Sequence, residues 1–340
     1  MKKREDRPGT KYLHQKTVVI TGASSGAGMA AALEFAKYRC TLVLAARRTE
    51  ALDKVVAQCR DLGATAIAVK TDVTNAGEVH RLAAAAIDYS GNIDVWVNNA
   101  GVLAAGDFDS TPLEVHDQVI RTNLMGYLHG AHAVLPYFKQ QRYGVLINNI
   151  SVGGWMPVPY GAAYSASKFG LRGFSEALRG ELSKWPGIHI CELYPAFLDT
   201  PGIQHAGNFT GSVLKPAPPV YDPRKVARAM VRLAQRPRRS TTIGGVATLL
   251  RLSHFVTPTL TVAITAKVME AYFRQAAPVS STTGNLFYSD DAQTLVDGGW
   301  KEEFKPSRKT VAAAVLAGAL ATGLLIWRQT RKDSAVAQKI

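Results

Sequence analysis

Residues 16–38 read KTVVITGASSGAGMAAALEFAKY, which is an apolar run, a glycine-rich turn and an alanine-rich segment in direct succession. The run at 16–22 is apolar at consecutive positions, which predicts a strand buried on both faces. The segment at 27–38 consists largely of good helix formers and predicts a helix. A strand that passes through a tight turn into a helix predicts the start of an alternating α/β fold.

The same alternation continues through most of the chain. Strands are predicted at 41–47, 65–73, 94–101, 144–151, 189–195 and 240–245, and helices at 50–63, 76–91, near 113–140, around 164–168 and from Pro223 to Gln235. Strands that are apolar on both faces and alternate with helices form a parallel sheet covered on both sides. We therefore predict a doubly wound, Rossmann-type α/β fold. Its last strand is expected at STTIGG, 240–245, and not at VDGG, 296–299.

The turn TGASSGAG, residues 21–28, is suited to hold a phosphate. Glycines at 22, 26 and 28 let the backbone approach a pyrophosphate, and the following helix offers the positive end of its dipole. The spacing is G-x-x-x-G-x-G and differs from the G-x-G-x-x-G of the Rossmann fingerprint. A glycine triplet alone is a weak signal, so the other motifs decide whether this turn binds a dinucleotide.

A second motif, YSASK at 164–168, places a tyrosine and a lysine four residues apart on a predicted amphipathic helix. Positions i and i+4 project from the same face of a helix, so the phenol and the amine share one site. Considered alone, such a pair is more often an incidental surface arrangement. Its significance depends on the rest of the chain.

Together, the motifs resemble those of the short-chain dehydrogenase/reductase family over about residues 16–245. In chain order they are TGASSGAG at 21–28, TDV at 71–73, NNAG at 98–101, RTNLMG at 121–126, NNIS at 148–151 and YSASK at 164–168. Each is common alone, but their order and separations are typical of the family. One departure is Ala196, which stands where the family usually has a glycine, while Thr200 is retained.

The resemblance implies a catalytic set of Asn123, Ser151, Tyr164 and Lys168. Tyr164 would exchange the proton, and the Lys168 cation would lower the pKa of this phenol from its usual value of about 10. Ser151 would hydrogen-bond the substrate oxygen. Lys168 would also bind the nicotinamide ribose, and Asn123 would hold a water that links Lys168 to solvent. The implied reaction is hydride transfer between a nicotinamide and a carbonyl compound or secondary alcohol.

The second predicted strand indicates which nicotinamide cofactor is bound. It ends Ala45-Ala46-Arg47-Arg48, without the acid that holds ribose hydroxyls in NAD-preferring enzymes. An arginine can bind a 2′-phosphate with paired charged donors, so NADP(H) is preferred, with Arg47 the first candidate and Arg48 the second. NAD(H) is the alternative, with both arginines as solvated surface charges. The predicted cofactor-binding residues are Thr21, Gly22, Ser24, Ser25, Gly26, Gly28, Arg47, Arg48, Asp72, Val73, Asn99, Ala100, Gly101, Tyr164, Lys168, Pro195 and Thr200.

Composition and charge narrow the class of protein. The 340 residues are 47% hydrophobic and carry a formal charge of +14. Residues 1–16 hold six basic residues against two acidic ones, and residues 301–340 hold eight against three. Charge concentrated at the ends argues against a nucleic-acid-binding protein and favours ends that meet an anionic surface. The three cysteines are widely spaced, which predicts reduced thiols and no metal site.

The C-terminal part is expected to lie outside the family fold. Residues 310–327, TVAAAVLAGALATGLLIW, are uncharged and flanked by basic residues. As a helix the run is roughly 27 Å long, so we predict a membrane span, with a packed terminal helix as the alternative. The apolar stretch 244–273 is interrupted by Arg251, His254 and Pro258 and is predicted to form a substrate lid or a membrane-surface helix.

These expectations divide the chain into four predicted segments. They are a basic N-terminal extension at 1–15, a catalytic Rossmann domain at 16–245, a lid and loop at 246–305, and a transmembrane anchor with basic flanks at 306–340. The apolar segment WMPVPY at 155–160 and the proline-rich loop at 215–223 suggest an apolar substrate cleft. Trp155 and Phe197 are expected either to line this cleft or to pack in the core.

The leading hypothesis is a membrane-associated NADP(H)-dependent reductase that acts on a lipophilic ketone, with its catalytic domain in the cytoplasm. One alternative is a nucleotide-binding scaffold or redox sensor without turnover, which the intact Ser151, Tyr164 and Lys168 argue against. Another is a soluble cytoplasmic 3-oxoacyl or polyol reductase. The expected partners are an apolar carbonyl substrate and a membrane, with no nucleic acid, and assembly is expected as a homodimer or homotetramer.

Overall fold

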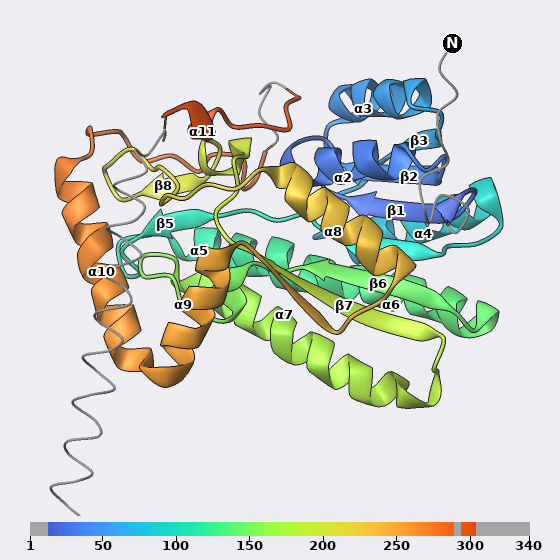
Figure 1. Ribbon diagram of the computed structural model, residues 1–340. Helices are drawn as coiled ribbons and strands as arrows, with labels where there is room; N and C mark the ends of the chain where they lie inside the picture. Colours follow the sequence, from blue (N-terminus) through green and yellow to red (C-terminus); the bar gives the residue numbers. More distant parts are fainter. Residues whose placement is uncertain (1–12, 289–293, 304–340) are drawn as a thin grey trace, which may run out of the picture. The chain divides into compact units, whose positions relative to one another are not determined.

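The computed structural model describes residues 13–288 and 294–303. The chain divides into two compact units, Met1–Trp300 and Lys301–Ile340, and only residues 301–303 of the second unit are described. In the first unit, helices cover both faces of a seven-stranded sheet (Figure 1). The predicted span at 310–327 lies outside the described residues. Within the described residues, no helix is long and apolar enough to cross a membrane.

All strands of the main sheet run parallel, in the order β3-β2-β1-β4-β6-β7-β9. Their bounds are β1 Thr17–Thr21, β2 Thr41–Ala46, β3 Thr65–Lys70, β4 Val95–Asn98, β6 Gly144–Asn149, β7 Ile188–Pro195 and β9 Ser240–Ile243. The predicted parallel, doubly wound sheet is confirmed, and β9 is its last strand. The strand order reverses between β1 and β4, which is where open α/β sheets bind ligands at the carboxyl ends of their strands.

The strands are apolar on both faces because each face carries a layer of helices. Val18 and Ile20 of β1 pack into one hydrophobic cluster, and Val19 packs into the other. The first cluster is completed by α2 Gly26–Ala36, α3 Thr49–Asp61 and α8 Pro223–Gln235. The second is completed by α4 Ala76–Ser90, α6 Gly126–Gln141 and α7 Ala162–Glu181.

The helix predicted near 113–140 has a local change of winding. It consists of α5 Leu113–Ile120, a π-helical turn η1 Arg121–Met125 and α6. Single π-helical turns inside α-helices frequently mark functional sites. This one contains Asn123, one of the predicted catalytic residues.

Several elements were not predicted from the sequence. Two short strands, β5 Ala104–Gly106 and β8 Gly207–Phe209, form a small parallel sheet of their own. After β9, in the stretch 244–273 where a lid or a membrane-surface helix was predicted, the chain forms a hairpin of two helices, α9 Gly245–Val256 and α10 Pro258–Gln275 (Figure 1). The remaining short helices are η2 Val152–Gly154, η3 Leu182–Lys184, η4 Pro201–Ile203 and α11 Trp300–Glu303.

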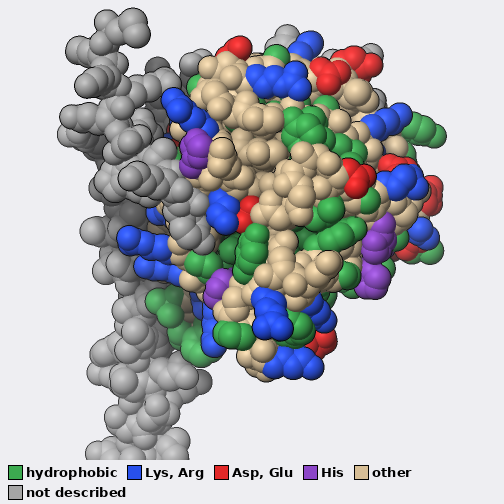
Figure 2. Space-filling view, turned by 90° about the vertical axis from the view of Figure 1, so that its right-hand side faces the viewer, with side chains coloured by type: hydrophobic (Ala, Val, Ile, Leu, Met, Phe, Trp, Pro, Cys, Tyr) green, Lys and Arg blue, Asp and Glu red, His purple; other side chains and the backbone are tan. Residues whose placement is uncertain are grey.

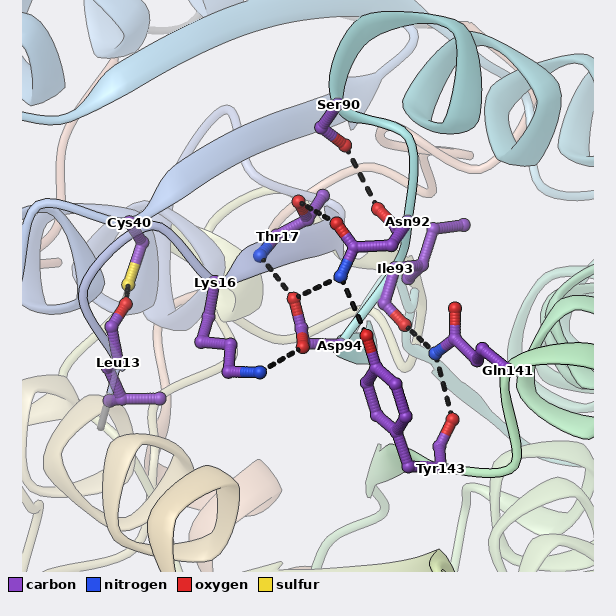
Figure 3. Close-up of polar contacts among 10 residues, drawn as sticks. All are labelled: Leu13, Lys16, Thr17, Cys40, Ser90, Asn92, Ile93, Asp94, Gln141 and Tyr143. Carbon is purple, nitrogen blue, oxygen red and sulfur yellow. Dashed lines mark hydrogen bonds and ion pairs between the residues drawn. The ribbon is translucent and has the colours of Figure 1, made fainter.

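A buried carboxylate, Asp94, ties the amino ends of β1 and β4 together (Figure 3). One of its oxygens accepts a hydrogen bond from Lys16 Nζ at 2.7 Å. The other accepts from the Thr17 backbone N–H at 2.8 Å and from the Asn92 side-chain amide at 2.9 Å. Because this network lies at the amino ends of the strands, it stabilises the sheet at the edge opposite the glycine-rich turn.

Candidate active site

A cleft of about 430 Å³ lies at the carboxyl ends of the central strands. Its walls come from the turn after β1, the ends of β2 and β3, and the loops that follow β4, β6 and β7. The cleft is lined by all the residues predicted to bind the cofactor except Thr21 and Gly28. The tertiary structure therefore brings segments more than 100 residues apart into one site.

Thr21 and Gly28 shape the turn without lining the cleft. The Thr21 hydroxyl accepts hydrogen bonds from the backbone N–H groups of Asn99 and Ala100, at 3.0 and 3.2 Å. At Gly28, a Cβ atom would lie 2.1 Å from the Gly22 carbonyl oxygen, so only glycine fits. These two residues fix the turn in place, and their neighbours in the turn line the cleft.

Ser151, Tyr164 and Lys168 all line the cleft. The Ser151 hydroxyl accepts a hydrogen bond from the Gly153 backbone N–H at 3.1 Å, and it lies close enough to the Tyr164 phenol to lower the pKa of that group. Ser151 has a φ of 123°, which is uncommon for a residue with a side chain. Strained backbone of this kind concentrates at functional sites, where the surrounding structure holds it.

Burial is the main cause of the pKa shifts of Tyr164 and Lys168. Burial raises the pKa of Tyr164, and the hydrogen bond to Ser151 opposes that rise. Burial lowers the pKa of Lys168 from 10.5 to about 7. The expectation that the lysine cation lowers the pKa of the phenol is therefore wrong for the chain by itself. Desolvation is the larger effect, and it also removes part of the charge of Lys168 at neutral pH.

Asn123 is buried beneath the cleft and does not line it. Its side chain accepts a hydrogen bond from the Val102 backbone N–H and donates one to the Val102 carbonyl, both at 2.8 Å. It also donates to the Ser167 hydroxyl at 3.3 Å. The side chain thus fixes the loop after β4 against α7. The role of holding a water beside Lys168 stays a prediction.

Two polar groups of the cleft wall fit the ribose of a dinucleotide. Lys168 is only 4% exposed, and its amine makes no hydrogen bond within the described part of the chain. The buried Oδ1 atom of Asn149 also lacks a partner there, while its Nδ2 donates to Asn99 Oδ1 at 2.9 Å. Buried polar groups are normally hydrogen-bonded, and ribose hydroxyls can both donate and accept. The glycine turn and this pair together fit a dinucleotide.

A segment close to the C-terminus, 280–300, reaches the part of the cleft formed by the glycine turn and Arg47, a contact that the sequence did not predict. Arg47 Nη2 donates to the carbonyl of Asn285 at 2.6 Å, and Nη1 lies 3.3 Å from the carbonyl oxygens of the next two residues. The Gly26 N–H donates to the Leu295 carbonyl at 2.8 Å. These acceptors are backbone atoms of a stretch, 280–300, that was expected only as a loop. Backbone acceptors leave no residue-type signature in a sequence.

Apolar side chains line another part of the cleft, and the two aromatic residues expected either to line it or to pack in the core behave differently. Phe197 lines the cleft, but Trp155 does not. The Trp155 ring is held between the guanidinium groups of Arg172 and Arg251, whose Cζ atoms lie 3.6 and 3.7 Å from the ring centre. The large apolar residues that line the cleft include Val102, Leu103, Val152, Met156, Val158, Phe197, Leu198 and Ile203.

The cysteines are free and buried. Burial raises the pKa of each thiol, in Cys40, Cys59 and Cys191, to about 12. No group of three or more metal-ligating side chains gathers among the described residues.

A doubly wound parallel sheet with its cleft at the point where the strand order reverses is the architecture of dinucleotide-binding proteins. The family model described as short chain dehydrogenase matches residues 16–209, more than half of the chain. The chain therefore belongs to the short-chain dehydrogenase/reductase family and is an oxidoreductase.

Some relatives match almost the whole of this chain, and others match only about 60% of it. An uncharacterized oxidoreductase named YxnA from Bacillus subtilis is 30% identical over 331 residues, which cover 95% of this chain and 92% of that protein. Dehydrogenase/reductase SDR family member 7 of Mus musculus is 32% identical over 207 residues, covering 60% of this chain and 61% of that protein. The similarity to YxnA therefore extends beyond the sheet into the helical hairpin and the C-terminal segment.

Two solved structures share the fold. An alcohol dehydrogenase from the archaeon Thermococcus sibiricus, complexed with 5-hydroxy-NADP, superposes with a TM-score of 0.59 at 27% identity, covering 68% of this chain and 97% of that one. A short-chain dehydrogenase from Streptomyces avermitilis superposes with a TM-score of 0.64 at 28% identity, covering 76% and 98%.

Proposed function

We propose that this chain is an NADP(H)-dependent oxidoreductase that reduces the carbonyl group of a lipophilic ketone to a secondary alcohol. The observation that carries the proposal is the meeting of Ser151, Tyr164 and Lys168 in one cleft with the glycine turn and Arg47. A nucleotide-binding protein without turnover has no need of a serine hydroxyl and a phenol that lie together beside a buried amine.

The cofactor would lie along the carboxyl ends of β1, β2 and β4. The turn at 21–28 would receive the pyrophosphate, and Lys168 with Asn149 would bind the nicotinamide ribose. Arg47 and Arg48 at the end of β2 would bind the 2′-phosphate, since both line the cleft. The Thermococcus sibiricus alcohol dehydrogenase, whose structure holds an NADP derivative, supports this preference.

The nicotinamide would supply the hydride. Tyr164 would donate the phenolic proton to the oxygen of the ketone as charge develops on it, and its raised pKa keeps the phenol protonated at neutral pH. The Ser151 hydroxyl, which lies close to the Tyr164 phenol, would donate a hydrogen bond to that oxygen and orient it. Lys168 titrates close to neutral pH and can therefore exchange a proton there. A protonated phenol favours reduction over oxidation.

The substrate class follows from the apolar end of the cleft. Side chains such as Met156, Val158 and Phe197 offer contact area to a hydrocarbon body but no charged partner. Specificity in such pockets comes from apolar burial together with a small number of polar groups at the reacting atom. A polyol would leave its hydroxyls without partners there.

The test is NADPH oxidation with a panel of ketones of increasing hydrocarbon size, using the full chain and its Tyr164→Phe variant. We expect kcat/KM of the full chain to rise along the series and the variant to be inactive throughout. Cofactor binding without turnover of any ketone would favour the scaffold alternative. Turnover that falls as the ketones become less polar would favour a polyol or 3-oxoacyl reductase.

The same proposal includes membrane association through residues 310–327, with the catalytic unit in the cytoplasm. The support is the uncharged run with its basic flanks. We expect the full chain to resist alkaline extraction from membranes. Leu320→Arg would release it, because a cation in a bilayer is costly, whereas Leu320→Ile would not. Release of the unaltered chain by alkaline extraction would contradict this membrane anchor.

We also propose that the chain assembles as a homodimer or a homotetramer. Sedimentation in detergent measures the mass of the assembly and tests this part of the proposal.

A further inference from the structure

The hairpin of α9 and α10 has its apolar side chains facing outward. In most surface helices of globular proteins the apolar stripe faces the core and polar side chains face solvent. Seven large hydrophobic residues of this hairpin are exposed, out of fifteen in the whole described chain. They form what is here called the outer face, which consists of Leu249, Leu252, Phe255, Val256, Leu260, Ile264 and Val268.

The outer face follows helical periodicity in both helices. In α9, Leu249, Leu252 and Val256 are spaced i, i+3 and i+7, and in α10 the spacing of Leu260, Ile264 and Val268 is i, i+4 and i+8. Such spacing gathers each set into a stripe. Exposure is greatest at Phe255, 84%, beside the turn that joins the two helices. Exposed apolar stripes of this kind mark an interaction site when they form one surface.

The inner side of the hairpin is fixed to the catalytic unit by specific contacts. Ala247 of α9 is fully buried in a cluster with Val152 and Ala196. Arg251 stacks on Trp155. In α10, the Tyr272 hydroxyl donates to the Val213 carbonyl at 2.6 Å. The hairpin therefore has a defined orientation, and its outer face cannot turn inward without breaking these contacts.

A second set of contacts ties α10 to the loop that precedes the catalytic helix α7. The rings of Phe273 and Tyr160 meet edge to face, with centroids 5.1 Å apart. Together with the stack of Arg251 on Trp155, this places a contact from each helix on the loop between Ser151 and α7. Residues of the same loop, Met156 and Val158, line the apolar end of the cleft.

The distribution of charged residues along the hairpin suits contact with lipid better than contact with a protein, whose interfaces usually have a polar rim. Between residues 245 and 266 the sequence has no aspartate or glutamate, and its one arginine, Arg251, is stacked inward on Trp155. The exposed charges of α10, which begin at Lys267, lie toward its carboxyl end. Helices that lie in a membrane interface bury an acid-free apolar face about 5–10 Å deep and keep their charges at the rim.

A second reason to expect that the hairpin contacts a lipid bilayer is the sequence that follows the described residues. The backbone N–H of Trp300 donates to Asp199 Oδ1 at 2.8 Å, so the chain is fixed to the catalytic unit at this point. The uncharged run begins at Thr310. Ten residues reach at most about 35 Å, so a run seated in a bilayer would keep the catalytic unit at that surface. An exposed apolar face would then meet lipid at high effective concentration.

We propose that the outer face of the α9–α10 hairpin docks into the surface of a lipid bilayer and holds the apolar end of the cleft beside the membrane. The proposal deepens the proposed function, on which it rests for the lipophilic substrate. A ketone dissolved in the bilayer would then reach the cleft along the loop at 152–160 without crossing bulk water.

The docking test places one cysteine in the full-length chain. Phe255→Cys is labelled with an environment-sensitive fluorophore, and the chain is reconstituted into phosphatidylcholine and phosphatidylglycerol vesicles. The native thiols are buried, with pKa values of about 12, so the new thiol reacts selectively. The matched control is Lys54→Cys on α3, at the other end of the molecule (Figure 1).

The fluorescent labels at positions 255 and 54 should respond differently to quenchers in the lipid and in water. We expect a blue-shifted label at 255 that is quenched by nitroxide-bearing lipids and shielded from aqueous iodide, and a label at 54 that responds only to iodide. For comparison, the face on the right-hand side of Figure 1 is shown in Figure 2. In its described part, basic and acidic side chains are interspersed, without a long apolar stripe like those of α9 and α10. Iodide quenching at both positions would overturn the proposal. Shielding at 255 without lipid quenching, rising with protein concentration, would instead identify a second copy of the chain and also overturn it.

An activity measurement tests the consequence for the substrate. The double variant Leu252→Ser/Phe255→Ser should lose at least tenfold in kcat/KM for a ketone dissolved in the vesicles and retain its kcat/KM for a water-soluble ketone. The control Tyr89→Ser removes an exposed aromatic residue from α4 and should change neither. Equal activity of the double variant with both ketones would overturn the link to substrate delivery. Absence of turnover with every ketone would contradict the proposed function alone, because the fluorescence readout requires no turnover.

Discussion

The Nζ atom of Lys168 lies 5.5 Å from the centre of the Tyr164 ring and 5.4 Å from the centre of the Tyr127 ring. The amine thus lies near two phenol rings, of which Tyr127 is buried and Tyr164 is partly buried. Only Tyr164 lines the cleft, whereas the Tyr127 hydroxyl donates to the Asn149 carbonyl at 2.7 Å beneath it. The two tyrosines therefore form a natural pair for separating proton transfer from packing.

Tyr164→Phe should abolish ketone reduction while leaving NADPH binding nearly unchanged. Loss of a positioned acid typically costs about 10²–10⁴-fold in rate. Steady-state kinetics and cofactor fluorescence measure the two effects. Tyr127→Phe is the control and should retain kcat, with a modest loss of stability from the missing buried hydrogen bond. Near-full activity of Tyr164→Phe would show that another group transfers the proton.

Binding of NADPH should be accompanied by proton uptake at pH 8. The pKa of Lys168 is about 7 in the chain alone, so the amine is mostly uncharged at that pH. The ribose and phosphate oxygens of a bound dinucleotide favour the charged form and raise the pKa, so a proton is taken up. Calorimetry in buffers of different ionisation enthalpy measures it. Lys168→Arg stays charged throughout, so it should bind without uptake; the same uptake in this variant would assign the proton elsewhere.

Arg47→Ala should reduce the preference for NADPH over NADH by about tenfold to a hundredfold, which corresponds to one charged hydrogen-bonded contact of about 1.5–3 kcal/mol. The variant also loses the bonds to the carbonyls at 285–287 and will be less stable. The ratio of kcat/KM values for the two cofactors cancels that general loss. Arg48→Ala is the comparison. If the ratio is unchanged in Arg47→Ala and reduced in Arg48→Ala, Arg48 is the residue that recognises the 2′-phosphate.

Asp94→Ala should lower the free energy of unfolding by about 1–3 kcal/mol, because it leaves the buried Thr17 N–H without its acceptor. Urea denaturation measures this loss. Since the network lies at the sheet edge opposite the cleft, KM for NADPH should not change. Asp94→Asn keeps one acceptor oxygen and should lose less stability. A large rise in KM with unaltered stability would mean that the two ends of the sheet are coupled.

Much of the fold can be predicted from the sequence because its signals are local. Apolar runs such as 16–22, alternating with helical segments, predicted the parallel sheet, and the run at 240–245 correctly marked its last strand. The glycine turn and the YSASK pair identified residues that line one cleft. These features depend on backbone periodicity and on residue types within a few positions of one another.

The remaining features depend on which surfaces meet. Trp155 was expected either to line the cleft or to pack in the core. It packs against a core cluster, and its ring is held by Arg172 and by Arg251, which comes from a helix almost 100 residues further along the chain. The side chain of Asn123 binds both backbone polar groups of Val102 and so supports the loop after β4, a contact that the sequence did not predict. Neither contact has a signature in the neighbouring sequence.

The sequence by itself determined the parallel sheet, the glycine turn and the pairing of a phenol with an amine, because hydrophobic periodicity and helix geometry act over short distances along the chain. Only the tertiary structure decided how the amine of Lys168 titrates, which backbone carbonyls hold Arg47, and that the hairpin of α9 and α10 turns its apolar stripes outward. Desolvation and packing depend on atoms that are distant in sequence, so these properties exist only once the chain has folded.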